Sequence, residues 1–179
     1  VDFKSTKEML EYAKSKILKP LREEEPYEYT VVMNIRTNKV LAEYKGGARS
    51  CSMSNLESLP LDDKDVVLMH GHPDSYPISK KDVKTLLNYK INQVIAIDKN
   101  GQFSMVARRN DVPAAKITSK EYSRFVDEVT ANSDDFLGMQ NKELMKLMTD
   151  YTLRNHADNL GIRYITNYDY LRGAKGKSK

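Results

Sequence analysis

The fold is decided by a short apolar run that leads directly into two histidines, DVVLMHGHP at residues 65–73. Residues 65–69 are too few for a helix and are apolar after the first position, so we expect a strand near the centre of a sheet. His70 and His72 are two residues apart, and the two-residue period of a strand places both imidazoles on one face. Gly71 between them leaves room for a close approach of another backbone element.

A Ser-x-x-Asp pattern follows the histidines at Ser79 and Asp82, where an amphipathic helix is predicted to begin. Residues three apart share one face of a helix. Only six residues, 73–78, join the strand to this helix, so the helix start can fold back over the histidines. Taken alone, Ser-x-x-Asp is typical of a helix cap and His-x-His is common near loops. Together, the two patterns predict a zinc site with His70, His72 and Asp82 as ligands and a fourth position for water.

The remaining apolar pattern predicts an α/β fold in which helices sandwich a mixed sheet. Asn100-Gly101 is typical of a tight hairpin turn with left-handed backbone geometry. Ahead of the histidines, Pro20 and the acidic residues after it are expected to end the first helix. The predicted elements are, in order, a helix over 5–19, strands over 29–35, 40–44 and 49–53, the strand over 65–69, the helix that opens at 79, and the hairpin of 94–97 with 103–107.

The composition changes near residues 111–113, and the chain beyond is predicted to be mostly helical. One helix follows a capping-box pattern at Thr118 and Glu121, and a second is expected to be capped by Gly161. We therefore expect three parts: a zinc domain over residues 1–112, a helical C-terminal extension over 113–173, and a disordered basic tail over 174–179.

Charge and cysteine content limit the partners and the compartment. The formal net charge is only +4, and several of the positive charges lie in the C-terminal tail, so we do not expect a nucleic-acid partner. Cys51 is the one cysteine, which excludes an internal disulfide and indicates a reducing compartment, the cytoplasm of a cell or of an infected host. The apolar runs are too short for a membrane-spanning helix.

These motifs resemble the signature of the JAMM (MPN-plus) metalloprotease superfamily, an upstream Glu followed by His-x-His-Pro and then Ser-x-x-Asp. In this chain the signature corresponds to Glu28, to residues 70–73 and to residues 79–82. The proline-containing loop before Ser79 is more similar to the RadC-like branch and to JAMM-like domains attached to phage head-morphogenesis proteins. The resemblance covers roughly residues 27–109.

The resemblance implies a cytidine-deaminase-like JAMM fold and a role for each site residue. His70, His72 and Asp82 would bind Zn²⁺, Ser79 would stabilise an oxyanion, and Glu28 would be the general acid and base. Glu28 begins the strand that leads toward the sheet, which favours it over the two glutamates just before it. Glu43, on the returning strand, is the rival candidate.

The activity implied is that of a zinc-dependent peptidase or isopeptidase that hydrolyses an amide bond of a protein or peptide substrate. Tyr76 would line the substrate entrance. Two alternatives stay open. In the first, the chain is a non-catalytic or cargo module of a phage head-assembly protein, associated with the virion through capsid or portal proteins. In the second, it is a RadC-like protein associated with DNA.

Overall fold

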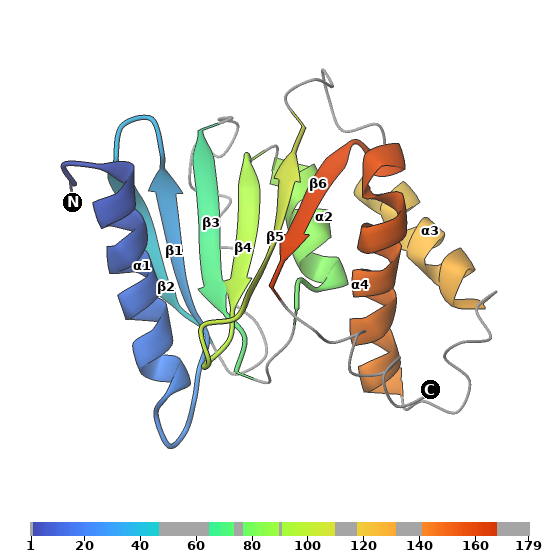
Figure 1. The fold of residues 1–179 in the computed structure, drawn as a ribbon, viewed down its shortest axis with the longest axis horizontal. Helices are drawn as coiled ribbons and strands as arrows, with labels where there is room; N and C mark the ends of the chain where they lie inside the picture. The colour runs from blue at the N-terminus through green and yellow to red at the C-terminus, as the bar shows by residue number, and fades with distance from the viewer. Residues whose placement is uncertain are drawn as a thin grey trace.

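A six-stranded mixed sheet forms the centre of the computed structural model, which describes residues 2–46, 65–73, 77–89, 91–109, 118–131 and 141–167. The strand order is β2-β1-β3-β4-β5-β6 (Figure 1). Only the neighbours β3 and β4 run parallel; the other neighbouring strands of this sheet are antiparallel. The strands are β1 (Tyr29–Asn34), β2 (Lys39–Lys45), β3 (Val66–Gly71), β4 (Gln93–Ile97), β5 (Phe103–Arg108) and β6 (Ile162–Thr166). The strand expected over 49–53, Tyr76 and the basic tail lie outside the described residues.

Helices cover both faces of the sheet, so the expected α/β class with a mixed sheet is confirmed (Figure 1). One helix, α1 (Thr6–Leu21), packs on β1 and β3. On the other face, α2 (Lys80–Tyr89) packs on β4 and β5, while α3 (Ser119–Ala131) and α4 (Asn141–Leu160) extend that layer past β6. Within the described residues, no helix combines the length and the apolar composition that a membrane crossing requires.

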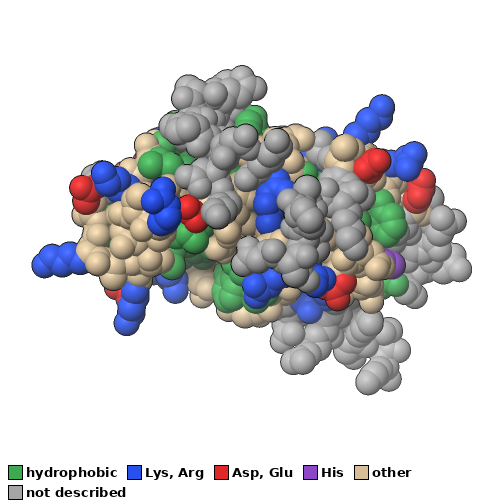
Figure 2. All heavy atoms as spheres, turned by 90° about the horizontal axis from the view of Figure 1, so that it is seen from above, with side chains coloured by type: hydrophobic (Ala, Val, Ile, Leu, Met, Phe, Trp, Pro, Cys, Tyr) green, Lys and Arg blue, Asp and Glu red, His purple; other side chains and the backbone are tan. Residues whose placement is uncertain are grey.

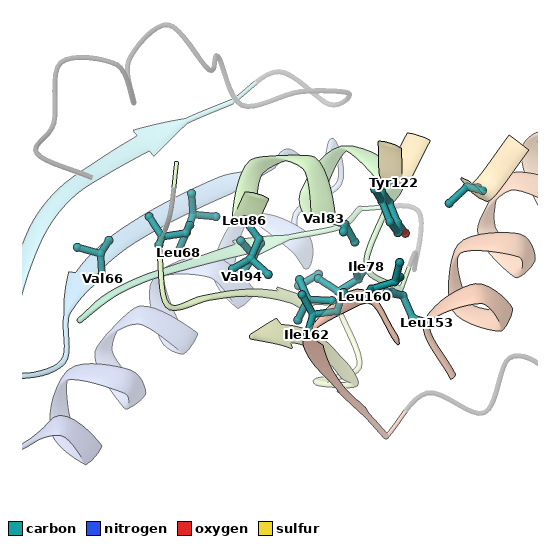
Figure 3. Close-up of a cluster of buried hydrophobic side chains, with 14 of the residues drawn as sticks. Val66, Leu68, Ile78, Val83, Leu86, Val94, Tyr122, Leu153, Leu160 and Ile162 are labelled. Carbon is teal, nitrogen blue, oxygen red and sulfur yellow. The ribbon is translucent and has the colours of Figure 1, made fainter. Parts of the chain in front are cut away.

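The strand β3 is buried along its whole length and contributes to both cores, as the apolar run predicted. Val67 and Met69 belong to the core under α1. Val66 and Leu68 belong to the larger core on the α2 face, which Figure 3 shows reaching from β3 to α4. Because side chains alternate along a strand, the next even-numbered residues, His70 and His72, face α2.

The first helix ends two residues later than the predicted boundary. Pro20 lies inside its last turn, and Leu21 is its final residue. A proline near the C-terminus of a helix removes only the backbone donor at its own position, and helical bonding continues beyond it here. The Arg22 N–H donates to the carbonyls of Leu18 and Lys19, each at 3.2 Å.

The hairpin between β4 and β5 is confirmed, but its turn differs from the expected one. Gly101 has a φ of 78°, whereas Asn100 is not left-handed. The loop is held instead by the buried Asp98, whose Oδ1 accepts from the backbone N–H groups of Asn100 and Gln102 at 2.9 Å. An Asp side chain that binds successive amides replaces the left-handed Asn that a two-residue turn would require.

Beyond residue 113 the described part of the chain is mostly helical, as predicted, but it also contains a strand that was not predicted, β6. Gly161, with a φ of 73°, reverses the chain after α4, and β6 then pairs antiparallel with β5. Leu160 and Ile162, on either side of this reversal, are buried in the same core as Leu68. The C-terminal segment therefore shares a sheet and a core with the residues before 113.

Gly71 provides a test of how closely α1 packs against the sheet. A Cβ atom at this position would lie 2.9 Å from Leu21 Cδ1 and 3.0 Å from Ile17 Cγ2. Overpacking of this kind costs about 1–3 kcal/mol, so we expect Gly71→Ala to lower the free energy of unfolding by that amount in urea denaturation. Leu21→Ala removes the obstructing methyl groups, and the cost of Gly71→Ala should be smaller in that background. An equal cost in both backgrounds would contradict this contact.

Candidate metal centre

Pairing of the central strands fixes the two histidines at one end of the sheet, the lower end in Figure 1. His70 pairs with Thr30 of β1 on one side and with Ala96 of β4 on the other. The His72 N–H donates to the carbonyl of Ile97 at 2.9 Å, which extends the parallel pairing beyond the last residue of β3. The backbone of both residues is thus held by neighbouring strands, and both side chains project toward α2.

A hydroxyl of β5 holds the segment that leads into α2. The Ile78 N–H donates to Ser104 Oγ at 2.6 Å, and Ser104 is almost fully buried. Ser104 pairs with Ala96, which in turn pairs with His70. This bond ties the start of α2 to the strands that carry the histidines. The sequence analysis missed Ser104; a hydroxyl residue at an inward position of an apolar strand is the signal that could have found it.

His70, His72 and Asp82 converge in a buried cluster, as the spacing predicted. Their potential ligand atoms all lie within 4.8 Å of one another. His70 Nε2 lies 2.8 Å from His72 Nε2 and 3.1 Å from Asp82 Oδ1, and His72 Nε2 lies 3.3 Å from Asp82 Oδ2. Each of the three residues is at most 9% exposed. No other group of three or more His, Cys, Asp or Glu side chains in the described part of the chain could hold a metal ion.

Hydrogen bonds alone do not satisfy these three contacts when the imidazoles are neutral and the carboxylate is ionised. If both Nε2 atoms carry a proton, the two N–H groups face each other across 2.8 Å. If only one Nε2 carries a proton, the other Nε2 directs its lone pair at a negatively charged oxygen of Asp82, 3.1 or 3.3 Å away. Two acceptor atoms then face each other without a proton between them. A cation among the three atoms removes this conflict, because each would then present a lone pair to the same charge.

The donor set and its spacing fit a zinc ion. Tetrahedral zinc with bonds of about 2.0–2.1 Å requires ligand atoms about 3.3 Å apart. The observed separations of 2.8–3.3 Å need only a small outward movement of the side chains. His70 Nε2 is the ring atom that is directed at the other two residues, and Nδ1 on the far side of the ring is buried without a hydrogen-bond partner.

Ser79 and Asp82 form a helix cap and the carboxylate still reaches the histidines. The Asp82 N–H donates to Ser79 Oγ at 3.1 Å, and the Ser79 N–H donates to Asp82 Oδ2 at 3.0 Å. This is the reciprocal bonding of a capping box. Asp82 Oδ1, which faces His70, takes no part in the cap. The two interpretations of the Ser-x-x-Asp pattern are therefore compatible, since one carboxylate serves both the cap and the cluster.

The environment of Asp82 is dry but favours its ionised form. Burial alone would raise the pKa of this carboxyl, but the charge and hydrogen bonds of His70 and His72 outweigh it and hold the pKa well below its usual range. The phenol of Tyr122, on α3, is fully buried, and its hydroxyl makes no hydrogen bond. Burial and the charge of Asp82 both raise the pKa of that phenol. Residues of the C-terminal segment thus contribute to the desolvation around the cluster.

Glu28 lies near the cluster in the strand register but is not part of it. It is two residues before Thr30, the partner of His70, so continued antiparallel pairing would place Glu28 opposite His72. The Glu28 carbonyl accepts from the Gly46 N–H at 2.9 Å, which holds this backbone beside β2. The Glu28 side chain is half-buried, and its carboxylate is not among the potential ligand atoms that converge.

Glu43, the rival general base, lies on the opposite face of the sheet. It pairs with Val31, which belongs to the core under α1. The Glu43 carboxylate accepts from the hydroxyl of Tyr12 at 3.0 and 3.1 Å and from that of Tyr29 at 3.2 Å. Burial and the charge of Glu43 raise the pKa of Tyr29 to about 12, so both phenols remain donors at neutral pH. The sheet itself separates Glu43 from the histidines.

The low pKa of Asp82 predicts how the metal-free protein responds to acid. Because the pKa is lower in the folded chain than the value of about 3.9 in the unfolded chain, the stabilisation is present above that value and is lost as the pH falls through the folded pKa. With a chelator present, we expect Asp82→Asn to make the free energy of unfolding fall less steeply than in wild type as the pH is lowered below about 4. Urea denaturation at a series of acidic pH values measures this slope. Equal slopes would contradict the assignment.

Comparison with known proteins gives no relative for this chain. No protein-family model, no curated protein and no solved structure matches it. The argument for its function therefore depends on the geometry of the cluster and on the motifs in the sequence.

Proposed function

We propose that the protein is a zinc-dependent peptidase or isopeptidase of the JAMM type, which hydrolyses an amide bond in a protein or peptide substrate. The observation that carries this proposal is the buried convergence of His70, His72 and Asp82. Three protein ligands with a free fourth position are typical of catalytic zinc, whereas structural zinc is usually held by four.

Each residue of the candidate site has a distinct task in this proposal. Bound zinc would acidify a water molecule and polarise the carbonyl of the scissile amide. Ser79 Oγ already accepts from the Asp82 N–H, so its own proton remains available for donation to the developing oxyanion. Glu28 would take a proton from the attacking water and deliver it to the leaving amine.

The finer fold assignment, a cytidine-deaminase-like JAMM domain, belongs to the same proposal. Its support is the position of the signature within the fold. The His-x-His pair ends the central strand β3, the Ser-x-x-Asp pair begins the next helix, and β4 then runs parallel to β3. The acid and base candidate precedes the strand on the other side of β3.

One observation favours a second candidate, a metal-binding module without catalysis, such as a component of phage head assembly. Among the described residues, no glutamate joins the three converging side chains. A module of this kind would bind metal, would co-purify with capsid or portal protein, and would hydrolyse no peptide bond.

The metal content is the first test of the proposal. We expect elemental analysis of the native protein to find about one zinc ion per chain, because the cluster offers one set of three ligands. His70→Ala should remove the zinc, and a chelator should lower the melting temperature of wild type while leaving that of the variant unchanged. Zinc absent from both proteins would overturn the proposal.

A glutamine substitution at Glu28 separates catalysis from metal binding. We expect Glu28→Gln to keep its zinc and to lose about a hundredfold or more of the chelator-sensitive cleavage of a peptide library, because it lacks the group that transfers the proton. Glu43→Gln is the matched control on the opposite face of the sheet, and it should retain cleavage. Full activity of Glu28→Gln would contradict its assignment. Zinc binding without cleavage by wild type would favour the non-catalytic module.

A further inference from the structure

A basic groove lies on the outer side of α2, the helix whose buried side carries Asp82 of the candidate metal centre. Its volume is about 460 Å³. Among the residues that the structure describes, the lining contains neither acidic side chains nor large apolar ones. The residues that line it are Lys80, Lys81, Lys84, Thr85 and Asn88 of α2 with Ser123 of α3.

The positive charge of this groove is only partly neutralised. Lys80 Nζ pairs with Asp127 Oδ1 of α3 at 3.0 Å, which joins the two helices at the edge of the groove. Neither Lys81 nor Lys84 forms an ion pair with any residue that the structure describes. Lysines three and four residues apart on a helix repel one another. An anionic partner would relieve this repulsion.

Elsewhere on the molecule, charges of both signs are mixed. Figure 2 views the molecule from above, from the end of the sheet away from the histidines, and acidic side chains there lie beside several of the Lys and Arg side chains. An excess of one sign in a concave surface attracts a ligand of the other sign more effectively than a mixed surface does.

We propose that this groove binds an acidic segment of a polypeptide, so that the substrates of the enzyme carry Asp or Glu residues close to the scissile bond. The preference for acidic substrates rests on the proposed function, whereas the binding of an acidic peptide to the groove does not depend on it. The helix supplies the connection, because Asp82 at the candidate metal centre and Lys81 at the groove belong to the same turn of α2.

The distances along α2 suit a peptide that occupies both places. The helix rises about 3 Å from Asp82 to Lys84 and about 9 Å from Asp82 to Asn88. An extended peptide advances about 3.3 Å per residue, so these rises correspond to acidic residues about one to three positions from the scissile bond. Asn88 and Ser123 offer neutral hydrogen-bonding groups for the peptide backbone.

The lining favours a peptide over a nucleic acid. No aromatic side chain lines the groove in the described part of the chain, so bases would find no stacking surface among these residues. Two cations without an acidic partner also provide few phosphate contacts, and nucleic-acid affinity depends chiefly on the number of such contacts.

The test measures binding of a fluorescent peptide that carries six glutamates, by anisotropy at low and high salt. We expect the double variant Lys81→Glu/Lys84→Glu to weaken binding at least tenfold. Lys7→Glu/Lys14→Glu is the matched control, since both lysines are exposed on α1 and the change in net charge is the same. The control should bind within twofold of wild type, and added salt should weaken wild-type binding.

Three results would overturn the proposal. The first is wild-type binding no tighter than that of a glutamine peptide of equal length. The second is an equal loss of affinity in the control variant. The third is tighter, lysine-dependent binding of a single-stranded DNA of the same charge, which would make the groove a nucleic-acid site. Lysine-dependent binding of the acidic peptide by a protein without zinc or cleavage would support the groove and contradict only the proposed function.

Discussion

The alternation of side chains along β3 is the constraint on which the rest of the site depends. The strand is buried between β1 and β4, so its odd-numbered residues must fill the core under α1 and its even-numbered residues must face α2. A shift of one residue would place His70 and His72 under α1 and apolar side chains against the start of α2. Gly71 reinforces this register, because a Cβ atom at this position would lie 2.9 Å from Leu21 and 3.0 Å from Ile17.

The candidate metal centre combines a local and a long-range interaction in one carboxylate. Asp82 completes the cap of its own helix and also contacts His70 and His72, which lie twelve and ten residues earlier in the chain. The cap fixes the side-chain conformation before any metal binds, which lowers the entropy that binding would cost. Ser104 adds a third element, because it holds the segment between strand and helix against β5.

Much of the fold and of the candidate site could be predicted because it depends on local periodicity. The two-residue period of a strand predicted that His70 and His72 lie on the same face of the sheet. The three-residue spacing predicted that Ser79 and Asp82 lie on the same face of the helix. The strand β6 was missed because five residues directly after a long helix carry a weak pattern of their own. Its place is set by pairing with β5, nearly 60 residues earlier in the chain.

The α/β class, the central strand with its two histidines, and the helix cap that supplies the carboxylate could be predicted from the amino-acid sequence. The face of the sheet on which Glu43 lies depended on tertiary structure. Glu28 precedes β1 and Glu43 lies within β2, and the pairing of β1 with its neighbours puts Glu43 on the α1 face. Tertiary structure alone also brought Tyr122 and the wall of the basic groove to α2 from the C-terminal segment. The physical reason is that the spacing of apolar side chains within one helix or strand is set by its own residues. Contacts between elements that are distant in the chain depend instead on how their apolar faces pack together.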